Sequence, residues 1–297
     1  MTGRHGRRSL FLLSILGLSG CGGDDVVLGD GRSGATGGQH PIPTFSRVSV
    51  VAPISAPGTI DDDPSLTADL TQLYFDSERE GGLGGEDVWR SVRSDRNQAW
   101  GAPEIVAELN SPDRETGIAL SANGMSVWFS SNRTGTIGGL DIYVATRSTV
   151  AEPWSAVARV DELCTADDDL VSAVDGSETT LYLARRSSAD SDYDLYVSER
   201  TENGLWGAPA AISELNTTGA ESDAFPVERD MGLLYSKAED LVIARRGSGS
   251  DPFRLAEALS GLNSPEDDRD PWATDDVSYV VFSSNRSGEY SLYEAWR

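Results

Sequence analysis

Residues 121–133 read Ser-Ala-Asn-Gly-Met-Ser-Val-Trp-Phe-Ser-Ser-Asn-Arg, and residues 141–143 follow as Asp-Ile-Tyr. The run around Phe129 is short, rich in aromatic and β-branched residues, and bounded by Gly, Ser and Asn. This composition is typical of a β-strand rather than a helix. The Asp-Ile-Tyr run has the same character, so the stretch predicts two strands joined by a loop.

The same pair of runs recurs along the chain. The first run is centred in turn on Phe75, Phe129, Leu183, Tyr235 and Phe282. These anchors are 54, 54, 52 and 47 residues apart. The second run begins in turn at Asp87, Asp141, Asp194, Asp240 and Ser291. A third element opens with an aromatic residue and runs nine residues to a leucine, starting at Trp100, Trp154, Trp206 and Phe253. About four short strands per repeat of this length is the period of a β-propeller blade.

The number of elements predicts how the propeller closes. The last repeat reaches Arg297 without an aromatic-led outer strand, whereas residues 45–54 near the start copy the pattern of residues 100–109. Pairing the two ends would leave no open sheet edge between the first and last blades. We therefore expect an all-β protein, a single five-bladed β-propeller closed by an N-terminal outer strand that joins the C-terminal blade.

The repeats resemble the TolB-type propeller repeat, a bacterial relative of the WD repeat, whose inner half reads S-x-D-G-x-x-L-Y-F-S-S-N-R followed by D-I-Y. The match is best in residues 121–143 and good in the first and fifth repeats. In the third repeat Ala184-Arg185-Arg186 replaces Ser-Asn-Arg, and the fourth repeat is the most degraded. The resemblance covers residues 44–297 and implies the fold, but this fold hosts binding modules and enzymes alike.

The first residues are typical of an export signal. Three arginines precede the apolar run of residues 10–18, which is too short to cross about 30 Å of hydrocarbon as a helix. Leu18-Ser19-Gly20-Cys21 resembles the bacterial lipobox, which implies lipidation of Cys21, for example by palmitate. We expect a lipoprotein signal peptide in residues 1–20, a flexible acylated tether in 21–43 and the propeller in 44–297. Ordinary cleavage that leaves Cys21 as a free thiol is the alternative.

Composition excludes several classes of function. The chain has 48 acidic and 24 basic residues and a formal net charge of −24, so nucleic acid and a directly bound anionic membrane are not expected partners. The two histidines, His5 and His40, precede the repeats, which therefore hold neither a Ser-His-Asp site nor a His-ligated metal. Cys164 is the other thiol and is expected to be a buried apolar residue.

Two polar positions recur in every repeat. An acid stands fourteen residues before each anchor, at Asp61, Glu115, Asp169, Glu221 and Asp268. A base follows each anchor strand, at Arg79, Arg133, Arg186, Lys237 and Arg286. The favoured interpretation is that the two rings pair and support the fold, because a buried unpaired charge is costly. The alternative is an acid ring at a channel mouth that binds a cation or a basic peptide.

Other acids occur in clusters, at residues 61–63, at residues 167–169, and at residues 266–268 with Asp270. Asp190, Asp192 and Asp194 alternate and are weak calcium candidates, because they lack the glycine and distal glutamate of an EF-hand loop. We interpret these acids as solvated loops and expect no cofactor. The glycine-rich segments 81–85 and 136–139 join two strands and are interpreted as hairpin turns, not phosphate loops.

These observations favour a monomeric, non-enzymatic binding module of the bacterial cell envelope, anchored by its lipid, with the outer membrane favoured and the propeller outside the cytoplasm. Its partner would be an envelope protein or a cell-wall polymer. The alternative is a carboxylate-based glycan hydrolase or lyase, or a sugar-binding lectin. The aligned acids repeat in every blade, whereas a catalytic pair should break the symmetry. A deep, asymmetric, acid-lined pocket would favour the enzyme.

Overall fold

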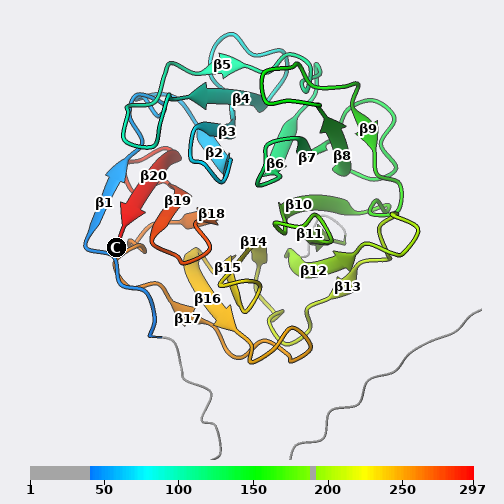
Figure 1. The fold of residues 1–297 in the computed structure, drawn as a ribbon, viewed down its shortest axis with the longest axis vertical. Helices are drawn as coiled ribbons and strands as arrows, with labels where there is room; N and C mark the ends of the chain where they lie inside the picture. The colour runs from blue at the N-terminus through cyan, green and yellow to red at the C-terminus, as the bar shows by residue number, and fades with distance from the viewer. Residues whose placement is uncertain (1–40, 188–191) are drawn as a thin grey trace, which may run out of the picture. The chain divides into compact units, whose positions relative to one another are not determined.

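The computed structural model describes residues 41–187 and 192–297, and these residues form five antiparallel sheets of four strands each around a common axis (Figure 1). They contain no helix, and therefore none long and apolar enough to span a bilayer. The predicted all-β, five-bladed propeller is confirmed. The proposed signal peptide, Cys21, both histidines and most of the proposed tether lie outside the described residues.

Each blade begins with its innermost strand and proceeds outward. Blade 1 comprises β2 (Asp61–Leu66), β3 (Gln72–Ser77), β4 (Asp87–Val92) and β5 (Glu104–Ile105). Blade 2 comprises β6 (Glu115–Leu120), β7 (Ser126–Ser131), β8 (Asp141–Thr146) and β9 (Ala158–Arg159). Blade 3 comprises β10 (Asp168–Val174), β11 (Thr180–Arg186), β12 (Asp194–Glu199) and β13 (Ala210–Ala211).

Blade 4 comprises β14 (Glu221–Val227), β15 (Gly232–Lys237), β16 (Asp240–Arg245) and β17 (Glu257–Ala258). Blade 5 comprises β18 (Asp268–Ala273), β19 (Tyr279–Ser284), β20 (Ser291–Trp296) and, from the other end of the chain, β1 (Arg47–Val50). The innermost strands of neighbouring blades contact one another around the hub, including β18 against β2. Residues at the same position of these strands therefore meet near the axis.

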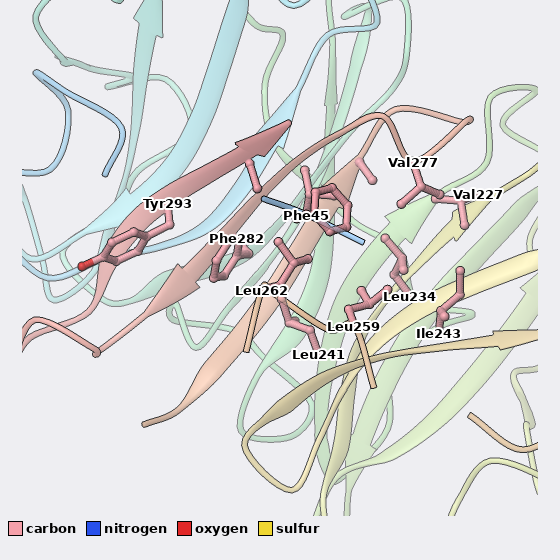
Figure 2. Packing of buried hydrophobic residues seen from close by; sticks show 13 residues of the cluster. Phe45, Val227, Leu234, Leu241, Ile243, Leu259, Leu262, Val277, Phe282 and Tyr293 are labelled. Atoms are coloured by element: carbon pink, nitrogen blue, oxygen red, sulfur yellow. The ribbon is translucent and has the colours of Figure 1, made fainter. Parts of the chain in front are cut away.

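The closing strand pairs as the sequence predicts. β1 runs antiparallel to β20, and Val48 lies opposite Ala295 in the register. Phe45, just before β1, is buried in a cluster with Leu262 and Phe282, as Figure 2 shows. This cluster joins blades 4 and 5, so the N-terminal segment contributes both backbone hydrogen bonds and apolar contacts to the closure.

The outer strands are shorter than the nine-residue spacing suggested. In blade 1 only Glu104 and Ile105 pair with β4, while Trp100 and Leu109 at the two ends of the segment are buried. The spacing therefore reflects two core contacts with a short ladder between them. The tryptophan packs in the core between blades, as expected for an aromatic residue repeated at one structural position.

Candidate functional site

The two polar rings are in contact with each other. Every acid of the ring is fully buried and forms an ion pair inside its own blade: Asp61 with Arg79, Glu115 with Arg133, Asp169 with Arg185, Glu221 with Lys237, and Asp268 with Arg286. Such pairs compensate the cost of burying a carboxylate.

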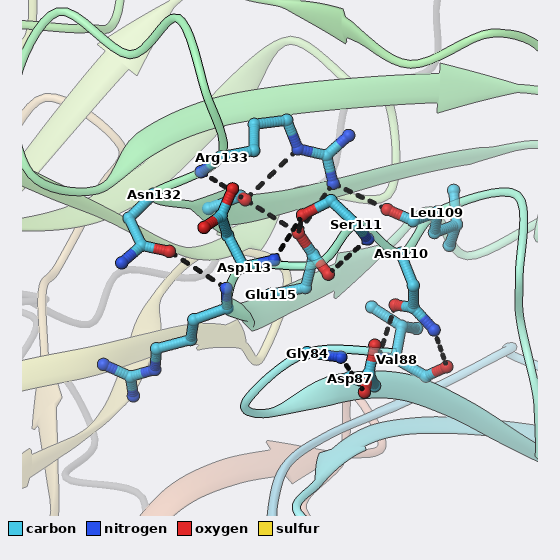
Figure 3. Close-up of polar contacts among 12 residues, drawn as sticks. Gly84, Asp87, Val88, Leu109, Asn110, Ser111, Asp113, Glu115, Asn132 and Arg133 are labelled. Carbon is cyan, nitrogen blue, oxygen red and sulfur yellow. Dashed lines mark hydrogen bonds and ion pairs between the residues drawn. The ribbon is translucent and has the colours of Figure 1, made fainter. Parts of the chain in front are cut away.

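Glu115 illustrates how completely these acids are engaged (Figure 3). Its carboxylate accepts hydrogen bonds from the Ser111 amide at 2.9 Å, the Ser131 hydroxyl at 2.8 Å and Nη2 of Arg133 at 3.0 Å. Arg133 also donates to the Leu109 carbonyl at 2.7 Å. The pair thus ties the end of one blade to the start of the next, and its lone pairs are directed at protein donors rather than at an opening.

In the third blade the base is Arg185, and the expectation of Arg186 is wrong. The reason is register: Asp169 lies directly opposite Arg185, whereas Asp61 in the first blade lies opposite Ser77 and takes its base from the following loop. Arg186 lies opposite Asp168 and forms an ion pair with it instead.

The weak calcium candidates do not form a described cluster. Asp190 lies outside the described residues. Asp194 begins β12, and burial raises its pKa, as do the charges of Glu221 and Asp192. Within the part of the chain that the structure describes, a different set of acids approaches closely enough to share a ligand.

That set is the axial triad, defined as Asp63, Asp223 and Asp270. One carboxylate oxygen from each lies within 4.8 Å of the others. The three residues come from the innermost strands β2, β14 and β18 of three consecutive blades, each two positions after its ring acid. Interpreting residues 61–63 and Asp270 as parts of solvated loops was therefore wrong, because they belong to strands at the hub.

A bulge in each strand places these acids. The register of β2, β14 and β18 against the next strand shifts at the triad position, and Asp63, Asp223 and Asp270 have left-handed φ values of 49°, 57° and 52°. A β-bulge re-aims a side chain, and Asp tolerates this conformation better than most residues. The side chains line a hub cavity of about 20 Å³, room for about one water, together with Ser172.

The other two blades differ at this position, so the site is asymmetric. Blade 2 carries Gly117, whose amide donates to Asp63 at 2.7 Å, as does the Thr116 hydroxyl. A β-carbon on Gly117 would lie 2.8 Å from the Val171 carbonyl oxygen, which excludes a side chain there. In blade 3 a shorter bulge places Ser172 at the cavity, with its hydroxyl buried and without a hydrogen-bond partner.

An arginine lies beside the triad. Arg269 forms ion pairs with Asp62 of the neighbouring blade and with Asp270, the latter at 3.4 Å, and its guanidinium lies 3.7 Å from the ring centroid of Tyr290. Asp62 and Asp270 are each about 8% exposed. The arginine thus supplies positive charge to a hub that is otherwise crowded with carboxylates.

The environments of these acids drive their pKa values in opposite directions. Burial raises the pKa of Asp270 well above its ordinary range, and the charges of Asp223 and Asp62 add to the effect. Burial and the charge of Asp63 raise the pKa of Asp223. Burial alone would also raise the pKa of Asp62, but the hydrogen bond from Asp270 and the charge of Arg269 lower it overall. The hub therefore holds a carboxyl group that favours its proton beside one that favours its charge.

Asp76 on β3 is also affected by the charges of the acids at the hub. It is almost completely buried, and one of its carboxyl oxygens has no hydrogen-bond partner. Burial raises its pKa well above the ordinary range, and the charges of Asp63 and Asp62 raise it further. Perturbed carboxyls at one place are a recurrent property of catalytic sites.

The sequence does contain a signal for the triad. The ring acids stand in every repeat, but two residues later the repeats read Asp, Gly, Val, Asp and Asp, and proline follows Asp63 and Asp270. An acid that recurs in three of five repeats breaks the five-fold pattern. Aligning the repeats for departures from symmetry, rather than for agreement, would have found it.

Comparisons with known proteins agree with the fold. A thermostable family-43 glycoside hydrolase matches with a TM-score of 0.53 at 12% identity, over 83% of this chain and 91% of that protein. A family-117 glycoside hydrolase from Zobellia galactanivorans matches with a TM-score of 0.53 at 12% identity, over 85% and 90%. A putative TolB from Agrobacterium tumefaciens has a TM-score of 0.46 at 16% identity, over 76% and 70%. The chain matches no protein-family model and no curated protein.

These findings correct the functional expectation. The preference for a non-enzymatic binding module rested on the lipobox-like residues, the expected tether and the absence of histidine from the repeats. The enzyme was disfavoured because the aligned acids repeat in every blade, and the axial triad breaks that repetition. The chain also shares its fold with glycoside hydrolases. The expectation of a scaffold that is not an enzyme is therefore wrong.

Proposed function

We propose that this protein is a carboxylate-based glycan hydrolase whose reaction centre is the axial triad. The observation that carries the proposal is the asymmetric meeting of Asp63, Asp223 and Asp270 at the hub of an otherwise five-fold repeat. Glycoside hydrolysis needs two carboxyl groups roughly 5 to 10 Å apart, one to protonate the leaving oxygen and one to act as base or nucleophile. The triad is more compact than that range, because its carboxylate oxygens lie within 4.8 Å of one another, so it is nearer to the short spacing of retaining enzymes than to the long spacing of inverting ones.

The residues divide into roles by their surroundings. Asp270, whose pKa is raised by burial and by two neighbouring charges, is the general acid. Asp63, which accepts hydrogen bonds from the Gly117 amide and the Thr116 hydroxyl, is the base or nucleophile. Asp223 contributes the strongest of the neighbouring negative charges that keep the proton on Asp270.

Arg269 and Asp62 act as positioning residues. The ion pair between them crosses from blade 5 to blade 1 and holds Asp62 in its charged form beside Asp270. A fixed negative charge next to an acid helps it to retain its proton. Replacing Arg269 by Gln should therefore shift the pH profile of turnover more than it changes substrate affinity.

The test is a hydrolysis screen of the full chain against a panel of plant, algal and bacterial glycans, with products read by mass spectrometry and reducing-end assay. The wild-type chain should release sugars from at least one glycan. Asp270→Asn and Asp63→Asn should each reduce that turnover at least about 100-fold, the contribution typical of general acid–base groups.

Asp251→Asn is the matched control, because Asp251 is exposed, lies in blade 4 between β16 and β17, and its side chain makes no hydrogen bond or ion pair among the described residues. It should leave turnover unchanged. Glycan binding without cleavage would identify a lectin, and an unsaturated product with ultraviolet absorbance would identify a lyase. Either outcome would overturn the hydrolase.

We further propose that the enzyme is held at the bacterial envelope through Cys21, on the strength of the lipobox-like residues 18–21. Metabolic labelling with a palmitate analogue should mark the wild-type chain in the membrane fraction, with the outer membrane favoured. Cys21→Ser should abolish the label and release the protein. Labelling that persists in this variant would contradict the anchor.

A further inference from the structure

A second and larger cavity lies on the same axis. It has a volume of about 500 Å³ and is lined by residues from all five blades, at the ends of the innermost strands and in the turns that follow them. We call this larger cavity the funnel. Phe225 lines both the funnel and the small cavity of the axial triad. Cavities of this size accommodate small organic ligands.

Aromatic rings form part of the wall. Phe225 and Trp272 both line the funnel, with ring centroids 5.8 Å apart and planes inclined by 53°. Leu66, Leu120 and Val174 complete an apolar inner surface. Such a surface suits the apolar face of a sugar ring better than a fully hydrated group.

Three carboxylates stand at the polar part of the lining, and they are not equivalent. Asp175 is engaged by its own turn, where it accepts from the Thr179 and Thr180 amides, both at 2.6 Å. Asp275 accepts from the Arg229 amide at 2.6 Å through one oxygen. The Asp230 carboxylate has no hydrogen bond or ion pair among the described residues, and it is half-buried. Burial and the charge of Asp175 raise the pKa of Asp230 overall, although the charge of Arg246, whose Nε donates to the Asp230 backbone carbonyl at 2.8 Å, lowers it, so the carboxylate charge is only partly compensated.

A strained turn presents Asp230. Glu228, Arg229 and Asp230 have consecutive left-handed φ values of 54°, 55° and 64°, which is costly for residues other than glycine. Blade 5 holds the turn in place, because the Glu228 amide donates to the Asp275 carbonyl at 2.7 Å. Strain of this kind persists where the surroundings fix it and is concentrated at ligand sites.

We propose that the funnel is a subsite for a sugar that carries a free amine, with the ammonium group at Asp230 and the ring against Trp272 and Phe225. This inference rests on the proposed glycan hydrolase and names its substrate class. Three carboxylates face a single cation in the lining, Arg229, so the funnel favours a positive ligand and disfavours a uronate. An ammonium group is also attracted to an aromatic face.

The experiment measures binding without turnover. The full chain carrying Asp270→Asn is titrated calorimetrically with a glucosamine trimer and with its N-acetylated counterpart, at a pH where the free amines are charged. The amine trimer should bind at least tenfold more tightly. Asp230→Asn, added to the same chain, should weaken that binding at least tenfold, whereas Asp251→Asn, also in blade 4, should not change it.

Arg229→Gln should change the affinity for the amine trimer in the opposite direction to Asp230→Asn. Because it removes the one cation of the lining, it should strengthen binding of the amine trimer several-fold, which loss of folding cannot imitate. Equal binding of the two trimers, or indifference to both Asp230→Asn and Arg229→Gln, would overturn the subsite.

Failure of this inference is separable from failure of the proposed function. Hydrolysis of a glycan without amines, together with indifference to Asp230, would remove the subsite and leave the enzyme. Selective amine binding in a wild-type chain that cleaves nothing would remove the hydrolase and leave an amine-sugar site.

Discussion

At the scale of single residues, the hub shows how one substitution in a repeat changes its chemistry. Two positions after the ring acid, Asp63 and Gly117 complement each other: the first supplies a carboxylate, and the second supplies the amide that binds it. Each residue stands at the bulge of its own strand, with a left-handed φ of 49° for Asp63 and 61° for Gly117. Their hydrogen bond depends on the contact between β2 and β6, which brings together residues more than fifty positions apart in the chain. The sequence of either strand alone does not indicate this contact.

Asp76→Asn should stabilise the protein as the pH rises. A buried carboxyl with a raised pKa contributes full stability while it is protonated, and this contribution is lost as the pH increases from the ordinary carboxyl range through the raised pKa. Asparagine does not titrate, so the variant should gain more than about 1 kcal/mol over wild type at high pH and little at acid pH.

Thermal or urea unfolding across the pH range gives the measurement. Asp251→Asn, an exposed aspartate, should track wild type throughout. A difference between Asp76→Asn and wild type that stays constant with pH would show that Asp76 does not titrate as described.

Cys164→Asn should also stabilise. In blades 1, 3 and 4 an asparagine at the matching position, Asn216 for example, accepts from and donates to the third strand, here the Leu195 amide at 2.8 Å and carbonyl at 3.1 Å. Cys164 occupies this place against Ile142 with a longer sulfur contact of 3.3 Å, and burial raises the pKa of its thiol to about 12.

Restoring the amide should add about 1 kcal/mol to the free energy of unfolding. The reciprocal change, Asn216→Ala, should remove a similar amount or more, because it leaves backbone groups unsatisfied. A loss of stability in Cys164→Asn would indicate that the half-buried site has no room for the larger side chain.

At the scale of elements, strand positions and the acid–base rings were readable from the sequence because they recur in every repeat. The register between neighbouring strands could not be read from the sequence. For this reason Arg186 was expected as the base of the third blade, whereas Arg185 is the residue that pairs with Asp169. The acids at residues 61–63 were misinterpreted for a related reason. A run of aspartates is typical of a solvated loop, and only the packing of five inner strands turns it toward an axis.

Removing one member of a ring pair should be costly. Arg133→Met leaves Glu115 buried without its ion-pair partner and frees the Leu109 carbonyl, so it should lower the free energy of unfolding by about 3 kcal/mol. Arg90→Met is the comparison, since Arg90 pairs with Glu104 at 3.3 Å and both side chains are more exposed, at 31% and 68%. Equal losses in denaturant unfolding would show that the ring contributes nothing beyond a surface pair.

At the scale of the whole molecule, the blade count and the closure followed from the missing outer strand of the last repeat, and both are confirmed. The small cavity at the hub and the larger funnel could not be predicted from the repeats. Both cavities depend on which side chains lie near the axis, and Phe225, which lines both of them, has no distinctive place in the repeat.

A covalent link across the closure should stabilise the entire fold. Val48 and Ala295 are register partners with side chains in one apolar cluster, so Val48→Cys with Ala295→Cys should form a disulfide in a chain carrying Cys21→Ser. The oxidised form should be more stable by about 2 to 4 kcal/mol than the same protein after reduction. Matching unfolding curves for the two forms would show that the closure is not the point from which the propeller opens.

The pairing of β1 with β20 also sets an order of events during synthesis. Of the twenty strands described, β1 is synthesised before all the others and β20 after them, so residues 47–50 have no partner until residues 291–296 have emerged from the ribosome. Four blades can assemble while translation continues, but the fifth cannot. Products truncated before residues 291–296 would therefore carry an exposed β-edge, and a nascent propeller would depend on protection until those residues leave the exit tunnel.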